Sequence, residues 1–228
     1  GEPLLYQHIF DMIAYADKRN IYTTISTNGQ ILTKKNAEKI VQSGLNKIII
    51  SVDGTTQETY QKYRAGGNLN QVIEGIGYVR SQREKYRKKS PLIIVQFLVF
   101  RHNEHQTGDI KKLGKRWGAD KVKLKTAQIL KQEHITQFAP KNKRYSRYAK
   151  NNRQKKANRT KQCLRIWTTI QIACDGNIVP CCFDKNAFYR LGKINEKDGI
   201  RGIWQGKMFN KFRKSELQAD ICRNCPLG

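Results

Sequence analysis

The cysteines are the residues of this sequence whose number and spacing could support metal chemistry. All six lie between Cys163 and Cys225, and Cys222 with Cys225 forms a C-x-x-C turn that presents two sulfurs to one centre. Cys163 and Cys181 can meet across a short hairpin. We therefore predict that Cys163, Cys181, Cys222 and Cys225 converge on one metal site. Spacing alone allows zinc or an iron–sulfur cluster, and buried free thiols are the plainest alternative.

The other two cysteines have different roles in this interpretation. Cys182 follows Cys181 directly and could replace it as a ligand, whereas Cys174 is expected to be a small buried hydrophobic residue. Because the cysteines cluster at one end of the sequence, a local metal site is favoured over disulfide bonds distributed through the fold. A reducing, cytoplasmic setting follows from that preference.

A hairpin and a helix are needed to position these cysteines. Alternation of isoleucines with other residues over 166–172 and a turn at 175–177 predict two antiparallel strands. Trp204, Met208 and Phe212 recur at helical spacing and predict a helix whose apolar stripe packs against the hairpin.

Small polar residues form a second group with chemical potential, in the first half of the sequence. They occur at Thr27-Asn28-Gly29, at Ser51-Val52-Asp53-Gly54, at Arg101-His102-Asn103-Glu104 and at the opening Gly1-Glu2-Pro3. The first three of these groups each follow a predicted strand, and the carboxyl ends of parallel strands meet at one edge of a sheet. These residues can line a binding site there, although ordinary turns have a similar composition.

Helices and strands alternate over the first 127 residues. Strands are predicted at 21–26, 47–52, 92–100 and 122–124, and helices at 7–19, from Thr33 to Gly44, around 72–79 and at 110–117. Strands that are apolar on both faces and separated by amphipathic helices specify a parallel sheet covered by helices, in an open sheet or a barrel. No G-x-G-x-x-G motif follows a strand, so a dinucleotide-binding Rossmann domain lacks support.

The charge of the sequence is strongly positive. The 228 residues contain 44 Lys+Arg and 18 Asp+Glu, a formal net charge of +26, which attracts polyanions. Residues 141–161 carry many lysines and arginines and no acid; we expect an exposed connector, with a nucleic-acid contact as the alternative. No apolar run approaches the roughly 20 residues needed to span a bilayer, so no membrane contact is expected.

The order of the motifs resembles that of a known family. G-E-P at 1–3, T-N-G at 27–29, I-S-V-D-G at 50–54 and Tyr63-Arg64 before a glycine pair resemble the radical S-adenosylmethionine (SAM) enzymes. The cysteine frame, with L-G-K-I at 191–194 and G-I-W-Q-G-K-M-F at 202–209, resembles the SPASM/twitch extension that part of this family carries.

The resemblance implies an α/β fold in three parts. These are a partial (β/α)6 radical SAM barrel over 1–127, a basic connector over 128–162 and a small α+β SPASM/twitch cluster-binding domain over 163–228. It also shifts the expected metal from zinc to an auxiliary [4Fe–4S] cluster, held by the four predicted cysteines and relaying an electron.

Matching by position implies a SAM site. The implied residues are Gly1, Glu2, Pro3, Thr27, Asn28, Ser51 and Arg64, with Asn103 as a weaker candidate. The backbone of the first three would meet the amino group of SAM. Ser51 and Arg64 would hold its carboxylate, because an arginine fork matches a carboxylate in two hydrogen bonds. A surface arginine at a helix end is the plainer reading of Arg64.

The family's C-x-x-x-C-x-x-C loop, which binds the [4Fe–4S] cluster that cleaves SAM, is not found in this sequence. We expect it upstream of Gly1, and expect this fragment alone to be inactive. The intact enzyme would form a 5′-deoxyadenosyl radical that abstracts hydrogen, in a dehydrogenation or a peptide modification. Its partners would be a small-molecule or peptide substrate and an electron donor such as flavodoxin or ferredoxin. The alternative is a basic nucleic-acid-binding module with a structural four-cysteine zinc site.

Overall fold

The computed structural model describes residues 1–129, 131–148, 163–194, 199–215, 219–223 and 225. The chain divides into two compact units, Gly1–Arg147 and Tyr148–Gly228.

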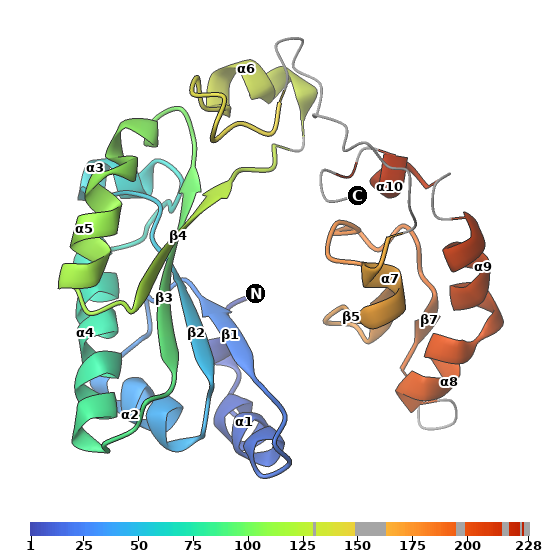
Figure 1. Ribbon diagram of the computed structural model, residues 1–228, viewed down its shortest axis with the longest axis horizontal. Helices are drawn as coiled ribbons and strands as arrows, with labels where there is room; N and C mark the ends of the chain where they lie inside the picture. Colours follow the sequence, from blue (N-terminus) through green and yellow to red (C-terminus); the bar gives the residue numbers. More distant parts are fainter. Residues whose placement is uncertain (130, 149–162, 195–198, 216–218, 224, 226–228) are drawn as a thin grey trace. The chain divides into compact units, whose positions relative to one another are not determined.

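A parallel four-stranded sheet is the centre of the first unit (Figure 1). Its strands are β1 (Thr24–Thr27), β2 (Lys47–Ser51), β3 (Leu92–Val99) and β4 (Lys121–Thr126), in the spatial order β1-β2-β3-β4. The helices are α1 (Ile9–Asp17), α2 (Lys34–Gln42), α3 (Gln57–Gln61), α4 (Leu69–Lys85), α5 (Asp109–Arg116) and α6 (Ile135–Phe138). Short 3-10 turns are η1 (Pro3–Leu5), η2 (Glu104–Thr107) and η3 (Gln132–His134). This order of strands and helices is the α/β architecture of a partial barrel, as predicted.

Side-chain caps fix where the covering helices begin. The Thr33 side chain accepts a hydrogen bond from the Asn36 amide at 3.2 Å, and the Asn68 side chain accepts one from the Gln71 amide at 3.2 Å. Each bond satisfies an amide that the first turn of a helix leaves without a partner. Gly44 follows α2 with φ +83°, a conformation that favours glycine, and so ends this helix where the sequence predicted.

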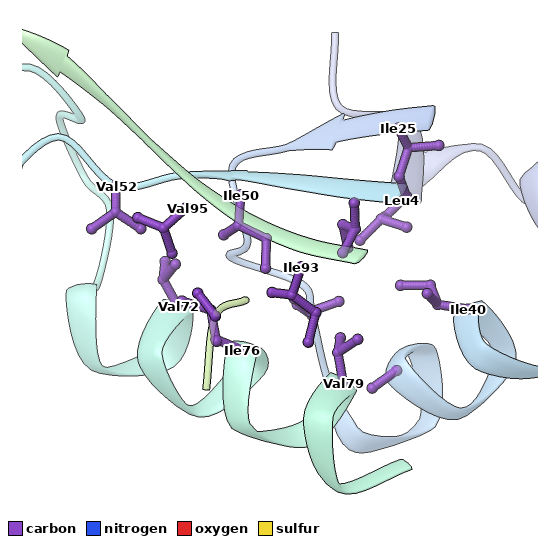
Figure 2. Packing of buried hydrophobic residues seen from close by; sticks show 14 of the residues in the cluster. Leu4, Ile25, Ile40, Ile50, Val52, Val72, Ile76, Val79, Ile93 and Val95 are labelled. Carbon is purple, nitrogen blue, oxygen red and sulfur yellow. The ribbon is translucent and has the colours of Figure 1, made fainter. Parts of the chain in front are cut away.

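The core of this unit lies between one face of the sheet and the helices α2, α4 and α5, which all cover that face (Figure 1). Figure 2 shows Ile50, Ile93 and Val95 from the strands meeting Val72, Ile76 and Val79 from α4. All six side chains are fully buried. Burial of a side chain of this size contributes about 1.5–3 kcal/mol, so this layer fixes the positions of the strand ends.

The start of the first strand differs from the prediction. β1 begins at Thr24 rather than Ile21, and Ile21 is 54% exposed. The Thr23 amide donates to the Asn46 side chain at 2.7 Å, so a loop contact precedes the first residue that pairs with β2.

Part of the predicted connector belongs to the first unit. The Arg101 amide donates to the Phe138 carbonyl at 2.9 Å, and Tyr145 packs against the apolar core. Arg147 Nε donates to Thr126 Oγ1 at 2.7 Å. Residues 141–144 are exposed as expected, whereas Tyr148 is buried, and residues 149–161 of the basic run lie outside the described residues.

The second unit has a small antiparallel sheet and short helices. The strands β5 (Gln171–Ile172), β6 (Asn177–Val179) and β7 (Gly192–Lys193) lie in the order β5-β6-β7. The helices are α7 (Arg165–Thr168), α8 (Gly199–Gln205), α9 (Lys207–Ser215) and α10 (Asp220–Arg223). The turn between β5 and β6 lies where predicted, with Gly176 at φ +80° and the Asn177 amide donating to Asp175 Oδ1 at 3.1 Å.

Two predictions for this unit are wrong in part, although Phe212 is buried and Trp204 packs against the core as predicted. Residues 165–168 form a helical turn, so the hairpin's first strand begins later and Trp167 is 47% exposed. The helix predicted across Trp204, Met208 and Phe212 is two helices that break at Gly206. The break changes the helical phase, so Phe209 is buried and Met208 is 58% exposed. Among the helices that the structure describes, none has both the length and the apolar character to cross a membrane.

Candidate functional site

The Glu2 side chain joins the start of the chain to the end of β1. Its carboxylate accepts hydrogen bonds from Thr27 Oγ1 at 2.7 Å, from the Asn28 amide at 2.8 Å and from the Leu4 amide at 3.2 Å. Thr27 is buried, and its Oγ1 also accepts from the Gly29 amide at 3.0 Å. Three of the predicted site residues are therefore in direct contact, although 25 positions separate Glu2 from Thr27 in the sequence.

These contacts leave the backbone at Gly1, rather than the Glu2 carboxylate, to meet a ligand. The Pro3 carbonyl already accepts from the Tyr6 amide at 3.1 Å and has only its second lone pair for a ligand. Both carboxylate oxygens of Glu2 already accept bonds from the chain, so this side chain positions the segment. A Cβ at Gly1 would have no atom within 4 Å, so there is open space beside this residue.

Ser51 lies at the same edge of the sheet, at the end of the neighbouring strand. Thr27 pairs with Ile50 in the parallel register, so Ser51 is one residue further along β2. Ser51 is buried and pairs with Gln96 of β3. The parallel strands thus bring the ends of β1 and β2 together, as the sequence predicted.

Arg64 is held at this edge by a buried carboxylate. Its Nε is 2.7 Å from Asp53 Oδ2, and Asp53, just beyond β2, is fully buried. Asp53 Oδ1 accepts from the Leu98 amide at 2.6 Å. Burial raises the pKa of the Asp53 carboxyl, and the Arg64 guanidinium acts against that rise. Neither terminal nitrogen of Arg64 bonds to another described residue, so the guanidinium can still bind a second carboxylate.

Asn103 has no free group for a ligand. It is fully buried, and its Nδ2 donates to the Asp53 carbonyl and to the Leu98 carbonyl, both at 2.9 Å. Its Oδ1 accepts from the Phe100 amide at 2.7 Å. The weaker assignment of Asn103 to the SAM site is therefore replaced by a structural role, in which the side chain fastens the loops after β2 and β3 to each other.

His102 is a candidate that the sequence reasoning missed. Its ring stacks on Phe100 with centroids 5.5 Å apart, and Phe100 meets Tyr63 at 4.5 Å. Its Nε2 is buried and has no hydrogen-bond partner among the described residues. Burial lowers the pKa of His102, and the charges of Lys62 and His105 add to this effect. The polar loop at 101–104 was noticed in the sequence, but which of its side chains faces a partner depends on the aromatic stack.

The cysteines differ in how far they are exposed. Cys222 is buried, Cys163, Cys181 and Cys225 are half-buried, and Cys182 is exposed. Burial raises the pKa of the Cys181 thiol, and the charges of Cys182 and Cys225 act in the same direction.

Within the described parts of the chain, no three or more His, Cys, Asp or Glu side chains form a group that could hold a metal ion. The predicted convergence of the four sulfurs stays a prediction, whereas Cys174 is exposed rather than buried. Thiols are the ligands that an iron–sulfur cluster requires, so the donor types fit. The assignment of four particular ligands stays a prediction.

Two family profiles match this chain. The Radical SAM superfamily matches residues 1–105, and the iron-sulfur cluster-binding domain SPASM matches residues 163–226. The AdoMet-dependent heme synthase of Nitratidesulfovibrio vulgaris is 30% identical over 120 residues, which are 52% of this chain and 31% of that protein. The chain thus spans less than a third of the length of this curated relative.

Solved structures share the fold at low identity. Streptococcus suis SuiB superimposes with a TM-score of 0.65 at 16% identity, covering 99% of this chain and 60% of SuiB. SuiB bound to precursor peptide SuiA gives a TM-score of 0.66 at 15% identity, covering 100% of this chain and 57% of that one. Residues 1–105 thus match the Radical SAM superfamily and residues 163–226 match the iron-sulfur cluster-binding SPASM domain, while the solved structures show a shared fold alone.

Proposed function

We propose that this chain supplies the SAM-binding edge and the auxiliary-cluster domain of a radical SAM enzyme that oxidises or otherwise modifies a peptide or a small molecule. The observation that carries the proposal is the contact of Glu2 with Thr27 and Asn28 at the carboxyl edge of a parallel sheet. It lies inside the region that matches the radical SAM profile.

Each residue of the edge has a role in this proposal. Glu2 holds the first residues against β1, so that the backbone of Gly1 and Pro3 can meet the SAM amino group. Ser51 donates its hydroxyl to the SAM carboxylate, and Arg64 binds the same carboxylate with its two terminal nitrogens. Asp53 fixes the Arg64 side chain, which reduces the rotamer entropy lost when the ligand binds.

Cys163, Cys181, Cys222 and Cys225 would hold the auxiliary [4Fe–4S] cluster, which supplies one-electron transfer when bound. Cleavage of bound SAM supplies a 5′-deoxyadenosyl radical for hydrogen abstraction. A second [4Fe–4S] cluster for the reduction of SAM belongs to the proposal, and none of the six cysteines of this sequence is assigned to it.

The substrate class rests on the relatives. One solved SuiB structure contains a precursor peptide, and the curated relative is a heme synthase. A peptide and a small molecule are therefore both candidate substrates. A protein electron donor such as flavodoxin or ferredoxin completes the set of partners.

Anaerobic reconstitution of the chain with iron and sulfide tests the cluster. We expect a brown protein with about four irons per chain, and loss of most iron when Cys225, or Cys181 together with Cys182, is replaced by serine. Cys174→Ser is the matched control and should keep its iron. A colourless protein with about one tightly bound zinc would instead support the nucleic-acid-binding alternative.

Calorimetric titration of SAM into the holoenzyme tests the proposed SAM site. Arg64→Ala should weaken SAM binding by about 1.5–3 kcal/mol, the loss typical of a hydrogen bond to a charged group. Arg80→Ala is the control, because Arg80 is an exposed arginine of α4 paired with Glu84 at 2.9 Å. Equal SAM affinity in both variants would remove Arg64 from the site.

A further inference from the structure

The sheet of the first unit has a second face, opposite the helix-covered core. Side chains alternate between the two faces of a strand, and residues paired in a parallel register share a face. Val122 and Leu124 of β4 pack against the core, so Lys121, Lys123 and Lys125 lie on the opposite face. All three lysines are exposed.

The register aligns these lysines with polar residues of the neighbouring strands. Lys123 pairs with Gln96 of β3, and Gln96 pairs with Ser51 of β2. Ser51, Gln96 and Lys123 therefore form one row across three strands on this face. Neighbouring strands lie about 4.8 Å apart, so the backbone of Lys123 is about 10 Å from that of Ser51.

The charge of this face is uncompensated. The strand residues on it are Thr24, Ser26, Lys47, Ile49, Ser51, Leu92, Ile94, Gln96, Leu98, Lys121, Lys123 and Lys125, and none of them is acidic. No ion pair of Lys121, Lys123 or Lys125 occurs among the described residues. Alternate residues of a strand are about 6.6 Å apart, so the three ammonium groups repel one another unless an anion lies between them.

A guanidinium at the end of the same strand also lacks an acceptor. Arg147 Nε donates to Thr126 Oγ1 and to the Thr126 carbonyl, at 2.7 and 3.1 Å. Its Nη1 is buried and has no hydrogen-bond partner among the described residues. Thr126 pairs with the core residue Val99, so its side chain lies on the core face, opposite to the three lysines, and Arg147 is not part of their site.

We propose that Lys123 and Lys125 bind an anionic group of the substrate, a carboxylate or a phosphate, with Gln96 as a hydrogen-bonding neighbour. The proposal deepens the proposed function and rests on it, because Ser51 of the SAM site is in the same row. The substrate then lies across β3 and β4 while SAM lies across β1 and β2, so both are at one edge of the sheet.

Protection of the sheet edge is the competing explanation. β4 is the last strand of the described sheet, and lysines on such strands prevent pairing with other chains. That role requires charge on the strand, but it does not require the alignment with Gln96 and Ser51. The two explanations differ in whether the lysines bind an anion saturably.

Calorimetric titrations of the chain with three probes test the proposal. Citrate represents a small carboxylate, inorganic pyrophosphate a phosphate and tetraglutamate a carboxylate within a peptide. We expect saturable binding of at least one probe, and its identity shows the source of the anionic group. Lys123→Gln with Lys125→Gln should weaken that binding about tenfold or more, since two charge-assisted hydrogen bonds are lost.

Lys111→Gln with Lys112→Gln is the matched control, because these exposed lysines of α5 carry the same charge. We expect less than about a twofold change there. Equal weakening in both double variants, or no saturable binding of any probe to the wild type, would overturn the proposal. Unchanged binding with new self-association of the β4 variant would establish edge protection instead. SAM binding and iron loading should be normal in the β4 variant, so their loss would count against the proposed function separately.

Discussion

Arg64→Ala should destabilise the first unit in a pH-dependent way, because it removes the partner of a fully buried carboxylate. Breaking a buried ion pair costs about 3–5 kcal/mol. Arg64 is one-quarter exposed and Asp53 keeps its bond from the Leu98 amide, so we expect about 2–4 kcal/mol near neutral pH.

The sign of the pH dependence follows from the raised pKa of Asp53, whose main cause is burial. A carboxyl whose folded pKa is raised stabilises the folded state below its unfolded pKa, and this contribution is lost as pH rises through the folded pKa. Without Arg64 the pKa of Asp53 rises further. The destabilisation should therefore be small near about pH 4 and full near about pH 7.

Hydrogen exchange at the Leu98 amide gives a local measurement, because this amide donates to Asp53 at 2.6 Å. Exchange in Arg64→Ala should accelerate as pH rises, beyond the intrinsic increase seen in the wild type. When Asp53→Asn is added to Arg64→Ala, the difference in exchange rate from the wild type should no longer depend on pH, because the buried carboxylate is gone. A destabilisation that is the same at both pH values would refute the reasoning.

Two further predictions concern the contacts that position this unit. Glu2→Gln should speed exchange of the Asn28 amide and cost about 1–2 kcal/mol, and unchanged exchange would contradict the positioning role. Burial acts to raise the pKa of Asp120, but the bonds from Arg83 and the Ile93 amide outweigh it, so this pKa is lowered. Its stabilisation is lost as pH falls through the lowered pKa, so urea unfolding of Asp120→Asn should show a flatter loss of stability in acid than the wild type.

Local signals in the sequence predicted the elements well. Thr33 caps α2 and Gly44 ends it, because both effects act within one helical turn. The start of β1 was misplaced because the β-branched composition suggested a strand from Ile21. Pairing with β2, which begins at Thr24, decides where the strand starts. The predicted stripe of Trp204, Met208 and Phe212 fails at Met208, because the break at Gly206 changes the helical phase without altering the apolar spacing in the sequence.

The site was predictable only as far as topology determines it. Parallel strands bring Thr27 and Ser51 to one edge whatever their side chains do. The pairing of Arg64 with Asp53 and the complete satisfaction of Asn103 depend on loop conformation, which no periodic pattern encodes. Convergence of the cysteine sulfurs, expected from spacing alone, stays a prediction.

The hydrogen bonds of Asn103 couple the loops after β2 and β3, so that the two loops move together. Its amide holds the Asp53 carbonyl after β2 and the Phe100 amide after β3, so neither loop can shift without stretching a bond to the other. If a ligand displaces Arg64, we expect the displacement to reach the Leu98 amide through Asp53, and then the ring stack of Phe100 and His102. The imidazole chemical shifts of His102 in a nuclear magnetic resonance spectrum should thus report ligand binding at the Arg64 guanidinium, although the two side chains are not in contact.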